Sequence, residues 1–84
     1  MNALEQFLAF VAHLQEEKIH FALKCVRDAI MVTIVTPPAY YEIEFFANGE
    51  IEVQKFAAGH VTSTTLDEIT KIVTDEWTGP DERP

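Results

Sequence analysis

The hydrophobic residues near the N-terminus repeat at the period of an α-helix. The apolar stripe spaced three or four residues apart consists of Leu4, Phe7, Leu8, Val11 and Leu14. Asn2, with Glu5 three residues later, is typical of a capping box, in which each residue satisfies the other's backbone N–H. This pattern predicts a helix over residues 3–17.

From Ile19 onward the hydrophobic period changes to two, which is typical of β-strands. We expect four strands, at residues 19–25, 29–36, 40–46 and 50–56. The second of them is apolar on both faces, as an interior strand of a sheet would be. Pro37 and Pro38 end it, because proline cannot donate a hydrogen bond to a neighbouring strand.

The turns between these strands predict how the strands pair. Residues 47–49 (Ala-Asn-Gly) fit a three-residue hairpin loop with Gly49 in the left-handed conformation, which places Ile43 opposite Val53. A two-residue Asn-Gly turn would place Val53 opposite Glu44 instead, so we reject it. Turns at 27–28 and 37–38 extend the same alignment. The residues expected at the centre of the core are Leu23, Val32, Ile43 and Val53.

A second amphipathic helix follows the strands and begins at Thr64 or Thr65, where Glu68 would complete a capping box. Its apolar side consists of Leu66, Ile69, Ile72, Val73 and Trp77. Gly79-Pro80 would stop it, and we expect residues 79–84 to form a disordered tail. The prediction is a single α+β domain over residues 1–78. It has the order α-β-β-β-β-α, with both helices packed on one face of a four-stranded antiparallel meander.

The opposite face of the predicted sheet combines acidic and aromatic side chains. Glu44 and Glu52 are expected to stand directly opposite each other, and like charges in that arrangement are destabilising. We expect a protein-binding site here, formed by Tyr40, Glu42, Glu44, Phe46, Glu50, Glu52 and Phe56. Alternatively, the glutamates only keep a solvated face from pairing edge to edge with another sheet. A row across the four strands at one end of this face would consist of His20, Val35, Tyr40 and Phe56.

The charge of the chain restricts its partners. Fourteen acidic and six basic residues give a formal net charge of −8, which repels nucleic acid and favours a basic protein partner. Cys25 is the only cysteine, as is usual in a reducing compartment. We find no secretory signal and no apolar run long enough to cross a membrane, so we expect a cytoplasmic protein without a membrane partner.

Residues that could carry catalysis or bind a cofactor are dispersed in the sequence. His13, His20 and His60 have no metal-ligand spacing, and the three glycines form no phosphate-binding loop. Cys25 is expected in the core, away from His20, rather than as a nucleophile. The acids of the second helix, Glu76 among them, are expected in solvent, and Trp77 is expected to close the core or to serve as an exposed docking residue. The sequence predicts no enzyme, no metal and no cofactor.

The central segment contains four short motifs: residues 29–32 (AIMV), 41–46 (YEIEFF), Asn48-Gly49 and Glu52-Val53. In these motifs it resembles a family of small, acidic, uncharacterised bacterial proteins. The resemblance implies the helix-flanked sheet described above. It also implies a likeness to immunity proteins, which neutralise a bacterial toxin by masking its basic active site. Tyr41 stands where a tryptophan is expected, and no catalytic residue comes with the family.

Two functions remain open at this point. The first is an immunity-like module that binds a basic partner through its acidic sheet face. The second is a homodimeric accessory protein without catalytic activity, in which that face pairs with a second copy. The glutamates disfavour the second, because a symmetric dimer would have to pair them with few bases.

Overall fold

Two helices flank five strands in the computed structural model, which describes residues 2–78. The predicted tail, 79–84, lies outside the described residues. In chain order the elements are α1 (Ala3–Glu16), β1 (Ala22–Val26), β2 (Ala29–Val35), β3 (Tyr40–Phe46), β4 (Ile51–Ala57), β5 (His60–Thr64) and α2 (Leu66–Thr78). Neither helix in the described part has the length and hydrophobicity that a membrane crossing requires.

Side-chain caps define where both helices begin. In α1, the Asn2 side chain accepts the backbone N–H of Glu5 at 2.8 Å, and Glu5 accepts the N–H of Asn2 at 3.1 Å, so the predicted capping box is confirmed. In α2, the Thr65 hydroxyl accepts the N–H of Glu68 at 3.2 Å. The Glu68 carboxylate accepts the Thr64 hydroxyl at 2.5 Å, and this bond holds the pKa of Glu68 below its usual value.

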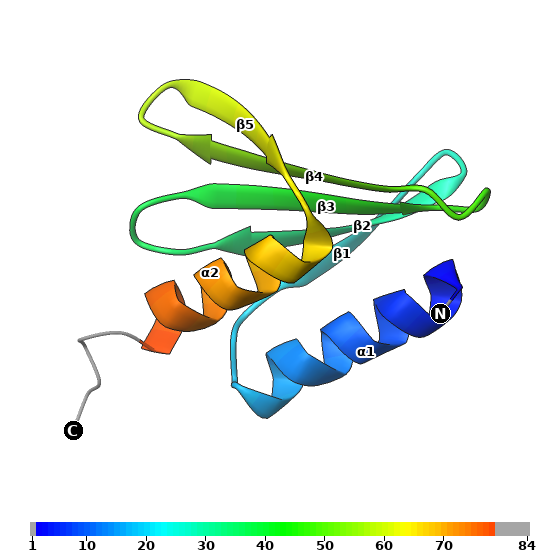
Figure 1. Cartoon of the computed structure of the whole chain (residues 1–84), viewed down its shortest axis with the longest axis horizontal. Helices are drawn as coiled ribbons and strands as arrows, with labels where there is room; N and C mark the ends of the chain where they lie inside the picture. Colours follow the sequence, from blue (N-terminus) through cyan, green and yellow to red (C-terminus); the bar gives the residue numbers. More distant parts are fainter. Residues whose placement is uncertain (1, 79–84) are drawn as a thin grey trace.

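The strands form one antiparallel sheet in the order β1-β2-β3-β4-β5 (Figure 1). Ile43 faces Val32 on one side and Val53 on the other, as the turns predicted. Gly49 has φ of 96°, and its N–H donates to the Phe46 carbonyl at 3.0 Å, which confirms the three-residue loop. The sequence therefore predicted the alignment of the first four strands correctly.

The prediction of four strands is wrong, because a fifth strand, β5, pairs with β4. The two strands are joined by a two-residue turn at Ala58 and Gly59, which have φ of 53° and 80°. His60, which the predicted bounds leave between the fourth strand and the second helix, is the first residue of β5 and faces Ala57. The strand was missed because it is polar or exposed along nearly its whole length and shows no hydrophobic alternation. Gly59 followed by Val61 and Thr62 was the available signal.

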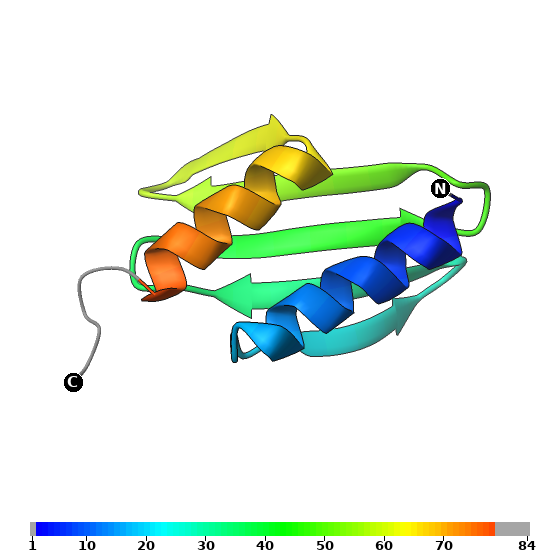
Figure 2. The same cartoon turned by 60° about the horizontal axis from the view of Figure 1, so that its bottom comes forward.

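Both helices cover the same face of the sheet, as predicted (Figure 2). α1 packs over β3 and α2 over β4. Between these layers lies one hydrophobic core, whose most deeply buried side chains are Leu14, Val32, Ile34, Tyr41, Ile43, Ile69 and Val73. Trp77 is partly buried against this core, which agrees with its expected role in closing it.

Two parts of the predicted core are wrong. Leu23 is 51% exposed and Cys25 is also exposed, because β1 is an edge strand and α1 crosses the sheet obliquely, leaving the end of β1 uncovered (Figure 2). On α1, Leu4 and Leu8 are exposed while Phe10, outside the predicted stripe, is buried. The buried side of α1 is thus rotated toward Phe10, whose large ring contributes more apolar area than a leucine.

Candidate functional site: the outer face of the sheet

The face of the sheet that the helices do not cover, here called the outer face, carries the residues predicted to bind a protein. Along β3 the side chains alternate between buried residues on the helix side and partly exposed residues on the outer face. The strand pairing extends this alternation to Glu52 and Phe56 of β4. Glu50 lies at the hairpin, where its carbonyl accepts the N–H of Phe46 at 2.9 Å. The predicted outer-face residues Tyr40, Glu42, Glu44, Phe46, Glu50, Glu52 and Phe56 are therefore brought together.

Two glutamates form the centre of this surface. Glu44 faces Glu52 directly across β3 and β4, with Glu44 half-buried and Glu52 exposed. The same row continues through Met31 to Lys24, so a hydrophobic residue separates Glu44 from the nearest base of that row. Across residues 2–78, the single ion pair involves neither Glu44 nor Glu52. This pair of like charges is consequently left without a salt-bridge partner in the described part of the chain.

Glu42 has a partner that the sequence did not reveal. The Tyr40 hydroxyl donates to a carboxylate oxygen of Glu42 at 2.9 Å. Burial, followed by this hydrogen bond, raises the pKa of Tyr40 above its ordinary value. Glu42 is thus partly compensated within the molecule, and the unrelieved negative charge lies mainly at Glu44, Glu50 and Glu52.

An apolar row borders the acidic residues at one end of the outer face. The rings of Tyr40 and Phe56 lie 5.5 Å apart, and the strand pairing continues this row to Val35 on one side and Val61 on the other. Both valines are more than half exposed. Aromatic and aliphatic side chains beside charged groups are typical of protein interfaces.

The position predicted for His20 in this row is wrong. β1 begins at Ala22 rather than at Ile19, so His20 precedes the strand. Its ring instead contacts the ring of Trp77 in α2, with centroids 5.7 Å apart. His20 therefore belongs to the helix-covered side of the molecule.

A polar cluster beneath α2 was not predicted. One carboxylate oxygen of Glu76 accepts the hydroxyls of Tyr41 at 2.5 Å and Thr36 at 2.8 Å, and Lys55 lies 3.8 Å from the other oxygen. Burial and the bond to Glu76 raise the pKa of Tyr41 well above its ordinary value. Glu76 is thus not the solvated acid expected from the helix pattern. The sequence feature that could have indicated this cluster was the alignment of the β3–β4 hairpin, which places Lys55 opposite Tyr41 on the helix side.

The remaining reactive side chains lie on separate elements of the described part of the chain. Within residues 2–78, no three side chains of His, Cys, Asp or Glu are grouped so that they could hold a metal ion. His13 shares a 2.8 Å hydrogen bond with Thr74 and so joins α1 to α2. Cys25 is exposed at the far edge of the sheet, on the strand that follows His20. The outer face therefore remains the strongest candidate for a functional surface.

Comparisons with protein-family models, with curated proteins and with solved structures found no match to this chain.

Proposed function

We propose that this chain is a non-catalytic protein-binding module that docks a basic partner protein through its outer face. The resemblance to immunity proteins suggests the kind of partner: a toxin or enzyme whose basic site would be covered. The single exposed thiol of Cys25 fits a reducing, cytoplasmic location. The observation that carries the proposal is the direct facing of Glu44 and Glu52.

The energetic argument starts from the repulsion within that pair. Like charges directly opposite on neighbouring strands cost a few tenths of a kcal/mol or more, and pairs of Thr or of opposite charge would be favourable at the same positions. Glu50 and Glu52 are exposed and Glu44 is half-buried, so all three can be reached by an approaching protein. A basic partner would relieve the repulsion, accelerate the encounter and give binding that weakens with added salt.

The aromatic residues of the outer face supply apolar contact area, which the glutamates cannot provide. Exposed charged pairs contribute modestly to affinity, whereas well-packed aromatic side chains contribute most. Tyr40, Phe46 and Phe56 lie partly exposed around the glutamates. We assign them the role of apolar anchors, and the glutamates the role of steering and orienting the partner.

The exposed valines favour a second candidate, the homodimeric accessory protein. The row from Val35 through Tyr40 and Phe56 to Val61 is apolar and could contact the same row of a second copy. Such a contact would have to remain at this end of the face, because a wider overlap would bring Glu44 and Glu52 of the two copies together. The basic partner uses the whole face and is therefore the better-supported candidate.

A charge-removal variant tests the proposal. Glu44→Gln with Glu52→Gln removes the facing pair and keeps the shape of both side chains. Asp67→Asn with Asp75→Asn, on the exposed side of α2, removes the same charge elsewhere. We expect the Gln variant to be slightly more stable than the wild type and to capture less of a basic protein from host extract at low salt. The α2 variant should capture it normally. Equal capture by both variants would exclude the outer face as the binding surface.

A further inference from the structure

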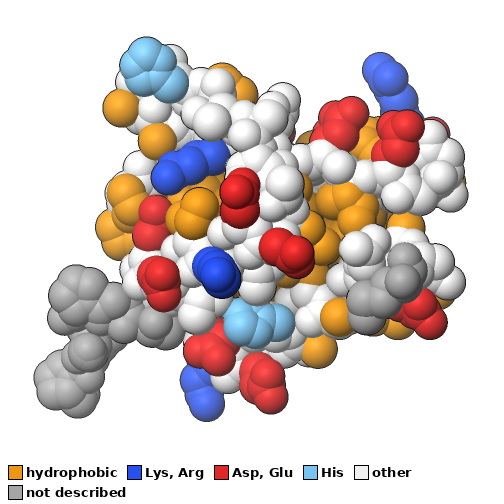
Figure 3. Space-filling view, viewed as in Figure 1, with side chains coloured by type: hydrophobic (Ala, Val, Ile, Leu, Met, Phe, Trp, Pro, Cys, Tyr) orange, Lys and Arg blue, Asp and Glu red, His pale blue; other side chains and the backbone are white. Residues whose placement is uncertain are grey.

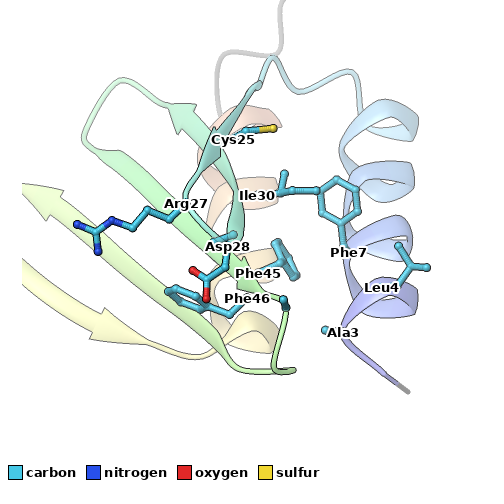
Figure 4. A pocket seen from close by; sticks show the side chains of 11 residues that line it. Ala3, Leu4, Phe7, Cys25, Arg27, Asp28, Ile30, Phe45 and Phe46 are labelled. Carbon is cyan, nitrogen blue, oxygen red and sulfur yellow. The ribbon is translucent and has the colours of Figure 1, made fainter.

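An apolar groove lies between α1 and the end of the sheet at which β1 turns into β2. It measures about 360 Å³ and is lined mainly by hydrophobic side chains, among them Leu4, Phe7, Cys25, Ile30 and Phe45. Phe7 and Ile30 point toward one another across it, and Cys25 points to the same side of the sheet (Figure 4). The space-filling view likewise shows hydrophobic side chains between the sheet and the N-terminal end of the chain (Figure 3). Leu4 and Ile30, which line the groove, are exposed, as are Leu8 of α1 and Leu23 of β1.

The groove is bordered by β1, an edge strand with unpaired backbone groups. Since residues 27–28 form a two-residue turn, Val26 and Ala29 are a hydrogen-bonded pair, and such pairs then alternate back along β1. Leu23 and Cys25 consequently direct their N–H and C=O groups away from β2. Exposed edges are usually protected by charged residues or prolines. In β1 the only charged residue is Lys24, whereas β5, at the opposite edge, consists mainly of residues with hydroxyl side chains.

We propose that two copies of this chain join through their β1 strands, which pair antiparallel about a two-fold axis at Leu23. In this alignment Leu23 faces Leu23 of the partner subunit, and Cys25 faces Phe21 of the partner subunit. The outward-directed backbone groups therefore meet, and the apolar side chains of the helix side lie together. Lys24 faces the small Ala22 of the partner subunit, so the two lysines do not oppose each other.

The neighbouring alignments are less favourable. An axis at Lys24 would place the two lysines directly opposite, which is destabilising. An axis at Cys25 would bring Leu23 against Arg27 of the turn, so the leucine would lose its apolar partner across the axis. Among alignments that use β1, the one centred on Leu23 alone combines backbone pairing, apolar contact and separated charges.

The charges near this edge also fit a second copy. With a net charge of −8, copies of the chain repel each other over most of their surfaces. The β1 edge differs, since β1 and the turn after it carry two bases, Lys24 and Arg27, and one acid, Asp28. The two-fold brings the turn that holds Arg27 toward the end of the partner's α1, where the chain carries Glu16 and Glu17. The Arg27 side chain thus approaches an acidic helix end twice in the dimer.

This dimer is independent of the proposed function. An axis perpendicular to the sheet keeps the helices of both copies on one side and both outer faces on the other. The two acidic surfaces would remain free and would be presented side by side. Failure of the dimer would leave the proposed binding of a basic partner untouched, and the reverse also holds.

The oligomeric state in solution tests the proposal. We expect sedimentation equilibrium of the wild type at micromolar concentrations to show a dimer. Leu23→Glu places two carboxylates opposite each other at an exposed position and should weaken the dimer roughly tenfold or more. Val61→Glu, at an exposed position of the other edge strand, is the matched control and should leave it intact. A monomeric wild type, or equal dimers in both variants, would overturn the proposal.

Cross-linking tests the alignment separately and uses the Cys25→Ser background. A hydrogen-bonded antiparallel pair has Cα atoms about 5.5 Å apart, which suits a disulfide. Leu23→Cys should therefore give a covalent dimer under mild oxidation, whereas Lys24→Cys, whose copies are offset by two residues, should not. Cross-linking at position 24 in preference to 23 would refute the two-fold axis at Leu23. Circular dichroism confirms that each variant is folded before it is compared.

Discussion

Neighbouring residues of β3 have opposite environments. A core residue and a residue of the candidate site are therefore adjacent in the sequence. Ile43 is fully buried between Val32 and Val53, while Glu42 and Glu44 on either side of it lie on the outer face. A shift of one residue in the pairing would exchange these two sets. The residues of β3 therefore report directly on the alignment of the sheet.

Ile43→Ala should destabilise the protein by about 2–5 kcal/mol, because it removes buried methyl groups and leaves a cavity in the core. Val35→Ala, at a position that is 64% exposed, is the control and should change the free energy of unfolding by about 0.5 kcal/mol or less. Urea denaturation of both variants measures the difference. An unchanged unfolding midpoint for Ile43→Ala would contradict the alignment.

Gly49→Val should destabilise the β3–β4 hairpin by roughly 1 kcal/mol or more, since a β-branched residue is strained at positive φ. Gly49 has φ of 96°, and an added Cβ would meet no atom within 4 Å, so the expected cost is backbone strain and not a clash. Ala47→Val in the same loop is the control. The three-residue loop would be in doubt if both variants melted at the same temperature.

At the scale of secondary-structure elements, the sequence predicted those features that depend on a local pattern of turns and apolar residues. The alignment of β1–β4 could be predicted because three turns and an apolar alternation agreed with one another. β5 could not, since its exposed Thr and Ser side chains lack that alternation. The exposure of Leu23 depends on how α1 crosses the sheet, which no local pattern encodes. The partners of Glu76 likewise depend on how α2 packs over β4.

Glu76 anchors the last turn of α2 to the sheet through Tyr41, Thr36 and Lys55. Hydrogen bonds to a charged group contribute roughly 1.5–3 kcal/mol, so Glu76→Gln should lower the free energy of unfolding by an amount in this range. Asp75→Asn, one residue earlier and exposed, should have little effect. Hydrogen exchange in the last turn of α2 should increase only in the Glu76 variant. Equal exchange in both variants would contradict the anchoring role.

The raised pKa of Tyr41 predicts how the stability of the protein changes at alkaline pH. Burial and the bond to Glu76 raise its pKa above the ordinary value of about 10, so the unfolded chain releases the phenol proton first. The contribution of Tyr41 to stability should thus be constant below about pH 10 and decrease above it. Urea unfolding of the wild type and of Tyr41→Phe across that range separates this effect from other groups. The same alkaline decrease in both proteins would contradict the assignment.

At the scale of the whole molecule, the two faces of the sheet differ in what covers them. One face is covered by α1 and α2 and holds the core (Figure 2). The other is left open and carries Glu44 opposite Glu52 in a chain of net charge −8. A sheet that needed only solubility could spread its acids apart. The central claim is that this open face binds a basic protein.

The affinity for the captured partner, measured by calorimetry at low and high salt, tests this claim most directly. We predict that Glu44→Gln with Glu52→Gln lowers the affinity roughly tenfold at low salt, equivalent to about 1.4 kcal/mol. It should also reduce the dependence of binding on salt, because fewer charges face the partner. Asp67→Asn with Asp75→Asn should bind as the wild type does. Wild-type affinity and wild-type salt dependence in the Gln variant would contradict binding through the outer face.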